Sequence, residues 1–447
     1  MTTASKSCRS FVSQALQRIP RSGIRDFFDI VANRKDVISL GIGEPDFVTP
    51  WHIRESAIRA IEKGATRYTA NLGMPELRQQ IARYVADAFH AQYDGMTEVL
   101  VSVGVSEAMD LAIRAVVEPG DEVLYHEPCF VAYAPLIRMA HAVPVPVETR
   151  AADGFRLRIE ALDLAVRAVL QPGDEVLYHE PCFVAYAPLI RLAGGVPVPV
   201  VTRAADDFRL RIAALEAAVT PRTRVLLLNF PTNPTGAALR RTDVEALAAF
   251  AIKHDLLVIT DEVYSELTYD VERVSIAAVP GMKERTVFLH GFSKAWAMTG
   301  FRLGFACAPV DLIEAMMKIH QYCMMSAPTV SQMAGIEALR HGAEDIVEMR
   351  ESYRQRRNYI CAALNEMGLS CHVPEGAFYV FPSIQSTGLT SMDFAMRLIN
   401  EESVACVPGT AFGACGEGYL RCCYATNIDL IKEAMSRMAR FVKKARG

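Results

Sequence analysis

VLLLNFPTNPTG at 225–236 begins as an almost unbroken apolar run and ends in a turn built from Asn, Pro and Gly. Such a run is typical of a strand buried on both faces of a parallel sheet. Similar short runs are VLVSV (99–103), DEVLY (121–125), LLVITD (256–261), TVFLHG (286–291) and LGFACA (303–308). Amphipathic segments such as 74–89 and 241–253 lie between the runs. The alternation predicts an α/β fold with a mostly parallel sheet covered by helices on both faces.

The pattern of helical and strand-like segments changes after residue 310. Two helical stretches, 311–324 and 329–366, precede short strand-like runs at GAFYVFPS (376–383) and YLRCCYA (419–425). This pattern predicts a smaller α+β domain. The Pro- and Gly-rich segment GIGEPDFVTP (41–50) is typical of a hinge. We therefore expect an N-terminal arm that is part of the small domain at 1–50, a large domain at 51–310 and the small domain proper at 311–447.

Composition excludes several classes of protein. The chain has 447 residues, a formal net charge of −4 and 22% charged residues of both signs, which disfavours a nucleic-acid or membrane partner. No apolar run approaches the roughly 18 residues of a spanning helix. The 11 cysteines lack the spacing of a metal site, and most are expected to be core residues of a cytoplasmic protein. The basic first 25 residues are read as an amphipathic helix of the fold in preference to a transit peptide.

One segment of the chain is written twice. Residues 119–138 and 172–191 are identical, and the wider match pairs 107–159 with 160–212 at an offset of 53 residues. A match present only twice is not a solenoid and indicates a tandem duplication inside another fold. We expect the first copy to keep its place in the sheet and the excess to bulge between about 148 and 212. The alternative is that the surplus copy impairs folding and leaves the protein inactive.

The predicted sheet brings polar side chains to one rim. Three strands end at Asn233, at Asp261 with Tyr264, and at Lys294. Ligands of open α/β sheets bind beyond the carboxyl ends of the strands. A lysine, a carboxylate, a phenol and an amide together suit one aromatic cofactor, pyridoxal 5'-phosphate.

A phosphate group needs a cradle of its own. VSVGVSEAMD (101–110) combines a strand, a turn of small residues and a helix start, with Ser106 expected as the N-cap. Arg302, flanked by Gly300 and Gly304, would add a charge-assisted hydrogen bond.

The chain as a whole resembles a known family. It is similar to the fold-type I, class I pyridoxal-phosphate aminotransferases, in the bacterial and archaeal aspartate/aromatic aminotransferase-like branch. The motifs that carry the resemblance are SLGIGEPDFVTP, TRYTANLGMPELR, NFPTNPTG, DEVYSELTY, GFSKAWAMTGFRLGF, PEGAFYVFPSI and GEGYLRCCYAT. They run almost end to end and imply the aspartate aminotransferase-like fold, with a sheet of the seven-stranded type.

The resemblance implies a role for each motif residue that contacts the cofactor ring. Lys294 is the Schiff-base lysine and the general acid/base, and Asp261 pairs with the pyridine nitrogen. Asn233 and Tyr264 hydrogen-bond the ring oxygen. The aromatic residue that stacks on the ring comes from the repeated motif PCF, which leaves Phe130 and Phe183 as candidates. Phe130 is favoured because only its copy is joined directly to the phosphate turn.

The resemblance also implies the remaining contacts. Val105, Ser106, Ser293 and Arg302 would address the phosphate, and Tyr68 would reach the phosphate of a neighbouring subunit, which implies a homodimer with shared active sites. Substrate contacts fall to three residues: Arg421 would grip the α-carboxylate, Gly43 would allow close backbone approach, and Asn233 would assist.

The implied reaction is ping-pong transfer of an amino group between an α-amino acid and a 2-oxo acid, as in amino-acid biosynthesis. A pyridoxal-phosphate-dependent β-lyase or decarboxylase is the alternative. A cofactor-binding regulator is disfavoured because few residues precede the hinge. Alanine, aspartate and aromatic amino acids all remain open as substrates.

Overall fold

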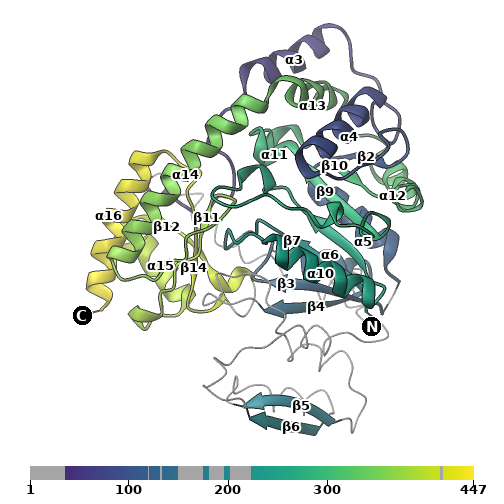
Figure 1. Cartoon of the computed structure of the whole chain (residues 1–447). Coiled ribbons are helices and arrows are strands. Elements are labelled where there is room, and N and C mark those ends of the chain that lie inside the picture. The colour runs from purple at the N-terminus through teal and green to yellow at the C-terminus, as the bar shows by residue number, and fades with distance from the viewer. Residues whose placement is uncertain are drawn as a thin grey trace, which may run out of the picture.

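The computed structural model describes residues 36–118, 120–130, 133–148, 175–180, 196–201, 223–412 and 416–446. Its centre is a seven-stranded sheet in the order β2-β10-β9-β8-β7-β3-β4 (Figure 1). The strands are β2 (Val99–Ser102), β3 (Glu122–Glu127), β4 (Val143–Glu148), β7 (Thr223–Asn229), β8 (Leu257–Asp261), β9 (Thr286–Gly291) and β10 (Gly304–Cys307). Neighbouring strands from β9 to β4 run parallel, whereas β10 is antiparallel to both β9 and β2. The predicted mostly parallel sheet is therefore confirmed.

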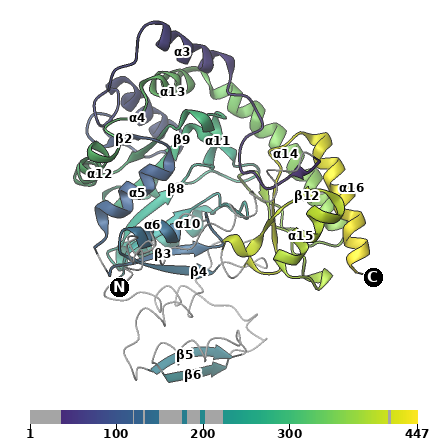
Figure 2. The same ribbon diagram turned by 180° about the vertical axis from the view of Figure 1, so that it is seen from behind.

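Helices cover both faces of this sheet, as the sequence pattern predicted (Figure 2). Alternate residues of β7 face opposite sides, so Leu226 packs with α10 (Arg241–Lys253), whereas Val225 packs with α5 (Val105–Val116). The other helices on the large domain are α3 (Trp51–Glu62), α4 (Pro75–Phe89), α6 (Tyr133–Met139), α11 (Phe292–Ala295), α12 (Val310–Cys323) and α13 (Thr329–His341).

The smaller domain combines helices with short strands. Its three-stranded sheet has the order β11-β14-β13, and β12 pairs in parallel with the N-terminal β1. These elements are β1 (Ile38–Ser39), β11 (Tyr379–Val380), β12 (Val404–Ala405), β13 (Val407–Pro408) and β14 (Leu420–Cys423), with α14 (Ala343–Glu366), α15 (Ser391–Glu402) and α16 (Ile428–Ala445). Ile38 and Ser39 thus join the small domain through strand pairing.

Two details differ from the expectation. The stretch 329–366 is two helices, because α13 ends at His341, Gly342 separates the two, and α14 begins at Ala343. Only Tyr379–Val380 of GAFYVFPS pairs as a strand. The division after residue 310 stays a prediction, although α13 shares a hydrophobic core with Ile53 of α3 and Leu77 of α4.

The described strands of the two copies of the repeated segment lie in different sheets. The first copy supplies β3 and β4 to the seven-stranded sheet, as predicted. The second copy supplies β5 (Glu175–Glu180) and β6 (Val196–Val201), which pair only with each other (Figure 1). Both pairs are parallel and share one register, since Glu122 is opposite Val143 and Glu175 is opposite Val196. Most of the predicted bulge and the expected N-terminal helix lie outside the described residues.

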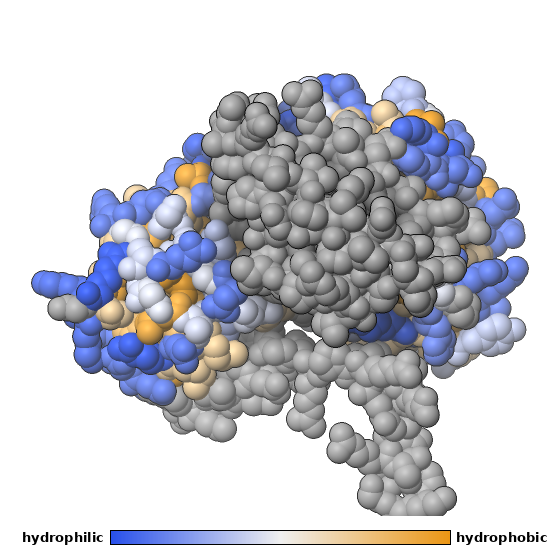
Figure 3. All heavy atoms as spheres, turned by 90° about the horizontal axis from the view of Figure 1, so that it is seen from below, coloured by the Kyte–Doolittle hydropathy of each residue, from blue (hydrophilic) through white to orange (hydrophobic). Residues whose placement is uncertain are grey.

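Length and apolarity decide whether any helix of the described ranges could cross a bilayer. No helix there combines the length and apolarity needed to cross a bilayer. Figure 3 shows the molecule from below, where the described surface is mostly hydrophilic and its apolar residues are interspersed with hydrophilic ones.

The position of the second copy generates a test. Deleting residues 149–201 joins Glu148 to Thr202 and restores one copy of the repeat. We expect the seven-stranded sheet to survive, because β5 and β6 make no strand pairs with it. Shortening the connection between β4 and β7 by 53 residues should stabilise the protein by about 1 kcal/mol. Denaturant unfolding followed by circular dichroism measures this difference, and a large loss of stability would show that the second copy supports the fold.

Candidate active site

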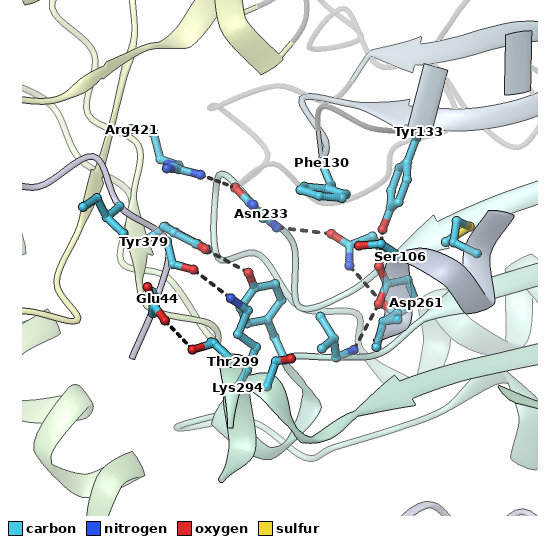
Figure 4. Close-up of a pocket in the computed structure, with 18 of the residues that line it drawn as sticks. Glu44, Ser106, Phe130, Tyr133, Asn233, Asp261, Lys294, Thr299, Tyr379 and Arg421 are labelled. Atoms are coloured by element: carbon cyan, nitrogen blue, oxygen red, sulfur yellow. Dashed lines mark hydrogen bonds between the residues drawn. The ribbon is translucent and has the colours of Figure 1, made fainter. Parts of the chain in front are cut away.

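A cavity of about 430 Å³ lies where the large and small domains meet (Figure 4). Its size is within the range of small-molecule sites. All predicted site residues line it except Tyr68 and the undescribed Phe183. They are Gly43, Val105, Ser106, Phe130, Asn233, Asp261, Tyr264, Ser293, Lys294, Arg302 and Arg421. The carboxyl ends of β7, β8 and β9 supply one wall, as expected for an open α/β sheet.

Lys294 is a partly buried amine, and its Nζ has one hydrogen-bond partner among the described residues. β9 ends at Gly291 and the short α11 then presents Lys294, whose Nζ donates to the Gly43 carbonyl oxygen at 2.7 Å. Desolvation by burial lowers its pKa from 10.5 to about 8, and the positive charges of Arg421 and Arg302 act in the same direction. A fraction of Lys294 is therefore neutral and nucleophilic near neutral pH.

Asp261 is the buried acid of the site. It ends β8, and its Oδ2 accepts a hydrogen bond from the Tyr133 hydroxyl at 2.5 Å, while Oδ1 accepts one from the Val263 amide at 3.2 Å. Desolvation raises its pKa to about 6, and the Tyr133 hydrogen bond, the Val263 amide and the charge of Lys294 all oppose that rise. Asp261 is thus ionised at neutral pH and can stabilise a protonated ring nitrogen.

Arg421 is a buried cation at the small-domain wall, only 3% exposed. Its Nη1 donates to Asn233 Oδ1 at 3.0 Å and its Nη2 to the Gly41 carbonyl oxygen at 2.5 Å. Its Nε has no hydrogen-bond partner among the described residues. The guanidinium also lies 4.6 Å from the ring centroid of Tyr379. A buried guanidinium with a free donor is suited to bind a carboxylate.

One corner of the cavity was expected to hold the phosphate, and its structure differs from that expectation in one respect. Ser106 was predicted as the N-cap of α5, but the N-cap is Gly104, whose φ of 79° lies in the left-handed region. Near this helix start, the Glu107 carboxylate accepts a hydrogen bond from the Val103 backbone amide at 2.5 Å. Ser106 is consequently in the first helical turn, where it lines the cavity together with Val105. Amides of a first helical turn lack intrahelical acceptors and favour an anion.

Arg302 completes this corner. Its backbone is left-handed, with φ of 52°, and a side chain added at Gly104 would come within 2.8 Å of its Nη2. Gly304 brings strand β10 against the same turn, because a Cβ there would lie 2.6 Å from the Val105 amide nitrogen. Ser293 is 8% exposed and lines the cavity beside Lys294.

Only one of the two aromatic candidates, Phe130, lies among the described residues. Phe130 lines the cavity and meets Tyr133 edge to face, at a centroid distance of 5.7 Å. Phe183 lies outside the described residues. Tyr68 is 79% exposed and is not part of the cavity wall formed by this chain.

Sequence reasoning missed several residues of the cavity. Tyr133 and Asn229 both bind Asp261, since the Asn229 amide donates to the Asp261 carbonyl oxygen at 3.0 Å. Tyr379, Glu44 and Thr299 also line the cavity, and the Thr299 hydroxyl donates to the Glu44 carboxylate. The available signal was proximity to motif residues, since Tyr133 closes PCFVAY and Tyr379 lies within PEGAFYVFPSI.

Comparison with known proteins agrees with this geometry. The family model described as aminotransferase class I and II matches residues 35–168 and 159–438. YugH of Bacillus subtilis is 48% identical over 97% of this chain and 99% of its own length. An aspartate aminotransferase of Pyrococcus abyssi is 41% identical over 97% of this chain and 98% of its own. The solved structure of an aromatic aminotransferase from Pyrococcus horikoshii OT3 matches with a TM-score of 0.79 and 40% identity, covering 94% of this chain and 99% of that one.

The lowered pKa of Lys294 predicts a pH profile. With a pKa of about 8, roughly one molecule in ten carries the neutral amine at pH 7, against a few in ten thousand for an ordinary lysine. Reductive methylation of the cofactor-free protein should therefore modify Lys294 at a rate that rises with pH and levels off above about 8. Peptide mass spectrometry measures the rate at this position, with Lys294→Ala as the background. A rate still rising steeply at pH 10 would contradict burial as the cause.

Two glycines that flank Arg302 provide a matched pair. Gly304→Ala should separate β10 from the Val105 turn, destabilise the protein by about 1–3 kcal/mol and weaken phosphate binding. Gly300→Ala is the control, because a Cβ there meets nothing within 4 Å. Thermal unfolding with and without inorganic phosphate measures both effects. Equal behaviour of the two variants would argue against the close packing of β10 on the turn.

Proposed function

The chain belongs to the class I and II aminotransferase family, and from that premise we propose that it transfers an amino group between an α-amino acid and a 2-oxo acid. The exchange is reversible and ping-pong, with pyridoxal 5'-phosphate as the cofactor. The observation that carries the proposal is one buried cavity lined by an amine of lowered pKa, Lys294, and an ionised acid, Asp261.

The residues present fit this cofactor. Asp261 would hold the pyridine nitrogen protonated, and Phe130 would lie against the ring. Ser106, Val105, Ser293 and Arg302 would hold the phosphate at the corner where the first turn of α5 meets β10. When bound, pyridoxal phosphate supplies an electron-accepting ring that carries an aldehyde able to react with amines.

The chain's own groups would handle the substrate. Arg421 would bind the α-carboxylate bidentately, through its free Nε and one outer nitrogen, and Asn233 orients that guanidinium. Gly43 has no side chain, which leaves room beside Tyr379, since any side chain at position 43 would collide with the Tyr379 hydroxyl. Lys294 Nζ, partly neutral at pH 7, would accept the proton released from the substrate α-carbon.

We also propose a homodimer with shared active sites. Large apolar side chains are exposed on α3 and on the segment that follows it, including Tyr68 at 79%, Trp51 at 59% and Ile61 at 58%. Exposed groups of this kind are typical of protein–protein contacts. In the dimer, Tyr68 of each chain would complete the phosphate site of the other.

The cellular setting and the origin of the repeat are likewise proposals. A cytoplasmic role in amino-acid metabolism is supported by the described cysteines, which are thiols rather than disulfides. A tandem duplication is supported by the offset of 53 residues, by the equal register of β3–β4 and β5–β6, and by family matches that overlap at 159–168.

An absorbance measurement tests the function. The purified protein should bind pyridoxal phosphate with a visible absorbance band, and single amino acids added in excess should bleach that band stoichiometrically. Lys294→Ala should lose the covalent band and reduce turnover at least about a thousandfold, because the nucleophile and the proton acceptor are both removed. Lys283→Ala, at a lysine paired with Glu98 outside the cavity, is the control. A folded protein without the band would refute the cofactor, and release of an unsaturated or decarboxylated product would favour the lyase or decarboxylase.

A further inference from the structure

Two tyrosine hydroxyls meet inside the cavity. Tyr264 follows β8 in the large domain and Tyr379 belongs to β11 in the small domain, and their hydroxyl oxygens are 2.8 Å apart. Both side chains are buried, at 5% and 1% exposure. Figure 4 shows Tyr379 between Arg421 and Lys294 at the cavity wall. Neither the motifs nor the family resemblance assigned a role to Tyr379.

Tyr379 is held on several sides. The Arg421 guanidinium lies over its ring, and the ring meets Phe378 edge to face at a centroid distance of 4.9 Å. Gly43 lies against the Tyr379 hydroxyl so closely that any side chain at Gly43 would displace it. The hydroxyl therefore has little freedom to leave Tyr264.

The direction of the hydrogen bond follows from proton counting. A phenol hydroxyl has one hydrogen to donate. Burial raises the pKa of both Tyr264 and Tyr379 far above the ordinary value, so both remain protonated. If Tyr264 donates its hydrogen to a group in the cavity, Tyr379 must donate to Tyr264. Linked hydrogen bonds polarise one another, so this donation strengthens the outer one.

We propose that Tyr379 is a positioning residue, whose hydroxyl donates to Tyr264 and thereby directs the Tyr264 hydrogen toward the ring oxygen of the cofactor. The inference rests on the proposed function, because it requires the ring oxygen to lie beside Tyr264. In this arrangement Tyr379 stabilises the ring oxygen as an anion without touching it. Because Tyr379 is part of the small domain, the strength of the Tyr264 hydrogen bond depends on the packing of the two domains.

Other charged and titratable groups face the same pair. Arg421 and Cys423 approach from β14, Lys294 from α11, and Asp261 from β8. Their charges influence the same equilibrium, so the test must isolate a single hydroxyl. Tyr379→Phe does so, because it keeps the ring beneath Arg421 and removes only the oxygen.

The test is an absorbance titration of the resting holoenzyme. The visible band should change with pH at a midpoint that rises by about half to one unit in Tyr379→Phe, because the ring-oxygen anion is less stabilised. Tyr353→Phe is the matched control. Tyr353 is also fully buried and its ring lies 5.5 Å from Phe378, but its hydroxyl has no hydrogen-bond partner among the described residues. The titration midpoint of Tyr353→Phe should equal that of the unmodified enzyme.

A double-substitution cycle identifies the route of the effect. In a Tyr264→Phe background, Tyr379→Phe should cause no further shift, because its hydroxyl acts through Tyr264. An unchanged midpoint in Tyr379→Phe, or an equal shift with and without Tyr264, overturns the proposal while leaving the aminotransferase function intact. Absence of any visible band in the unmodified protein refutes the proposed function instead. Should Tyr379→Phe fail to fold, 3-fluorotyrosine at 379, a stronger donor, should lower the midpoint, and no change would overturn the proposal.

Discussion

Desolvation of ionisable groups in one cavity is the constraint on which the candidate site depends. Burial lowers the pKa of Lys294 and raises that of Asp261, so each is moved toward its neutral form. A buried charge without partners costs several kcal/mol, and the surrounding polar groups must offset that cost. The Gly43 carbonyl does so for Lys294, and the Tyr133 hydroxyl does so for Asp261. The fold is therefore required to hold polar partners from distant parts of the chain at hydrogen-bond distance.

Close backbone packing satisfies that requirement where separate segments of the chain meet. Gly304 allows β10 to lie against the first turn of α5, and Gly43 allows the N-terminal segment to reach Tyr379. Through Arg421 and Tyr379, which bind Asn233 and Tyr264, the small domain contributes directly to a site whose lysine and acid come from the large domain. The chemistry and the contact between the domains are thus parts of one network.

The repeated segment shows how context decides between equal sequences. EVLYHE forms a strand in both copies, because local propensity and pairing with the following VPVPV run are the same. Only the first copy follows α5 directly and finds β7 as a further neighbour. Among the described residues, β5 and β6 of the second copy pair only with each other, although the EVLYHE of β5 is identical to that of β3. Whatever burden the extra 53 residues place on folding, the first copy keeps its place beside the cavity.

The sequence by itself determined the strands of the sheet and the motif residues at its rim, because apolar periodicity and turn chemistry are local properties. It did not determine the cap of α5, where Gly104 replaces the expected Ser106, because the backbone of the turn is set by the approach of Gly304. Only the tertiary structure decided that Tyr133 and Tyr379 belong to the site. Their partners, Asp261 and Tyr264, are 128 and 115 residues away along the chain. No local pattern encodes such pairs, since tertiary packing creates them, within the large domain for Tyr133 and between the two domains for Tyr379.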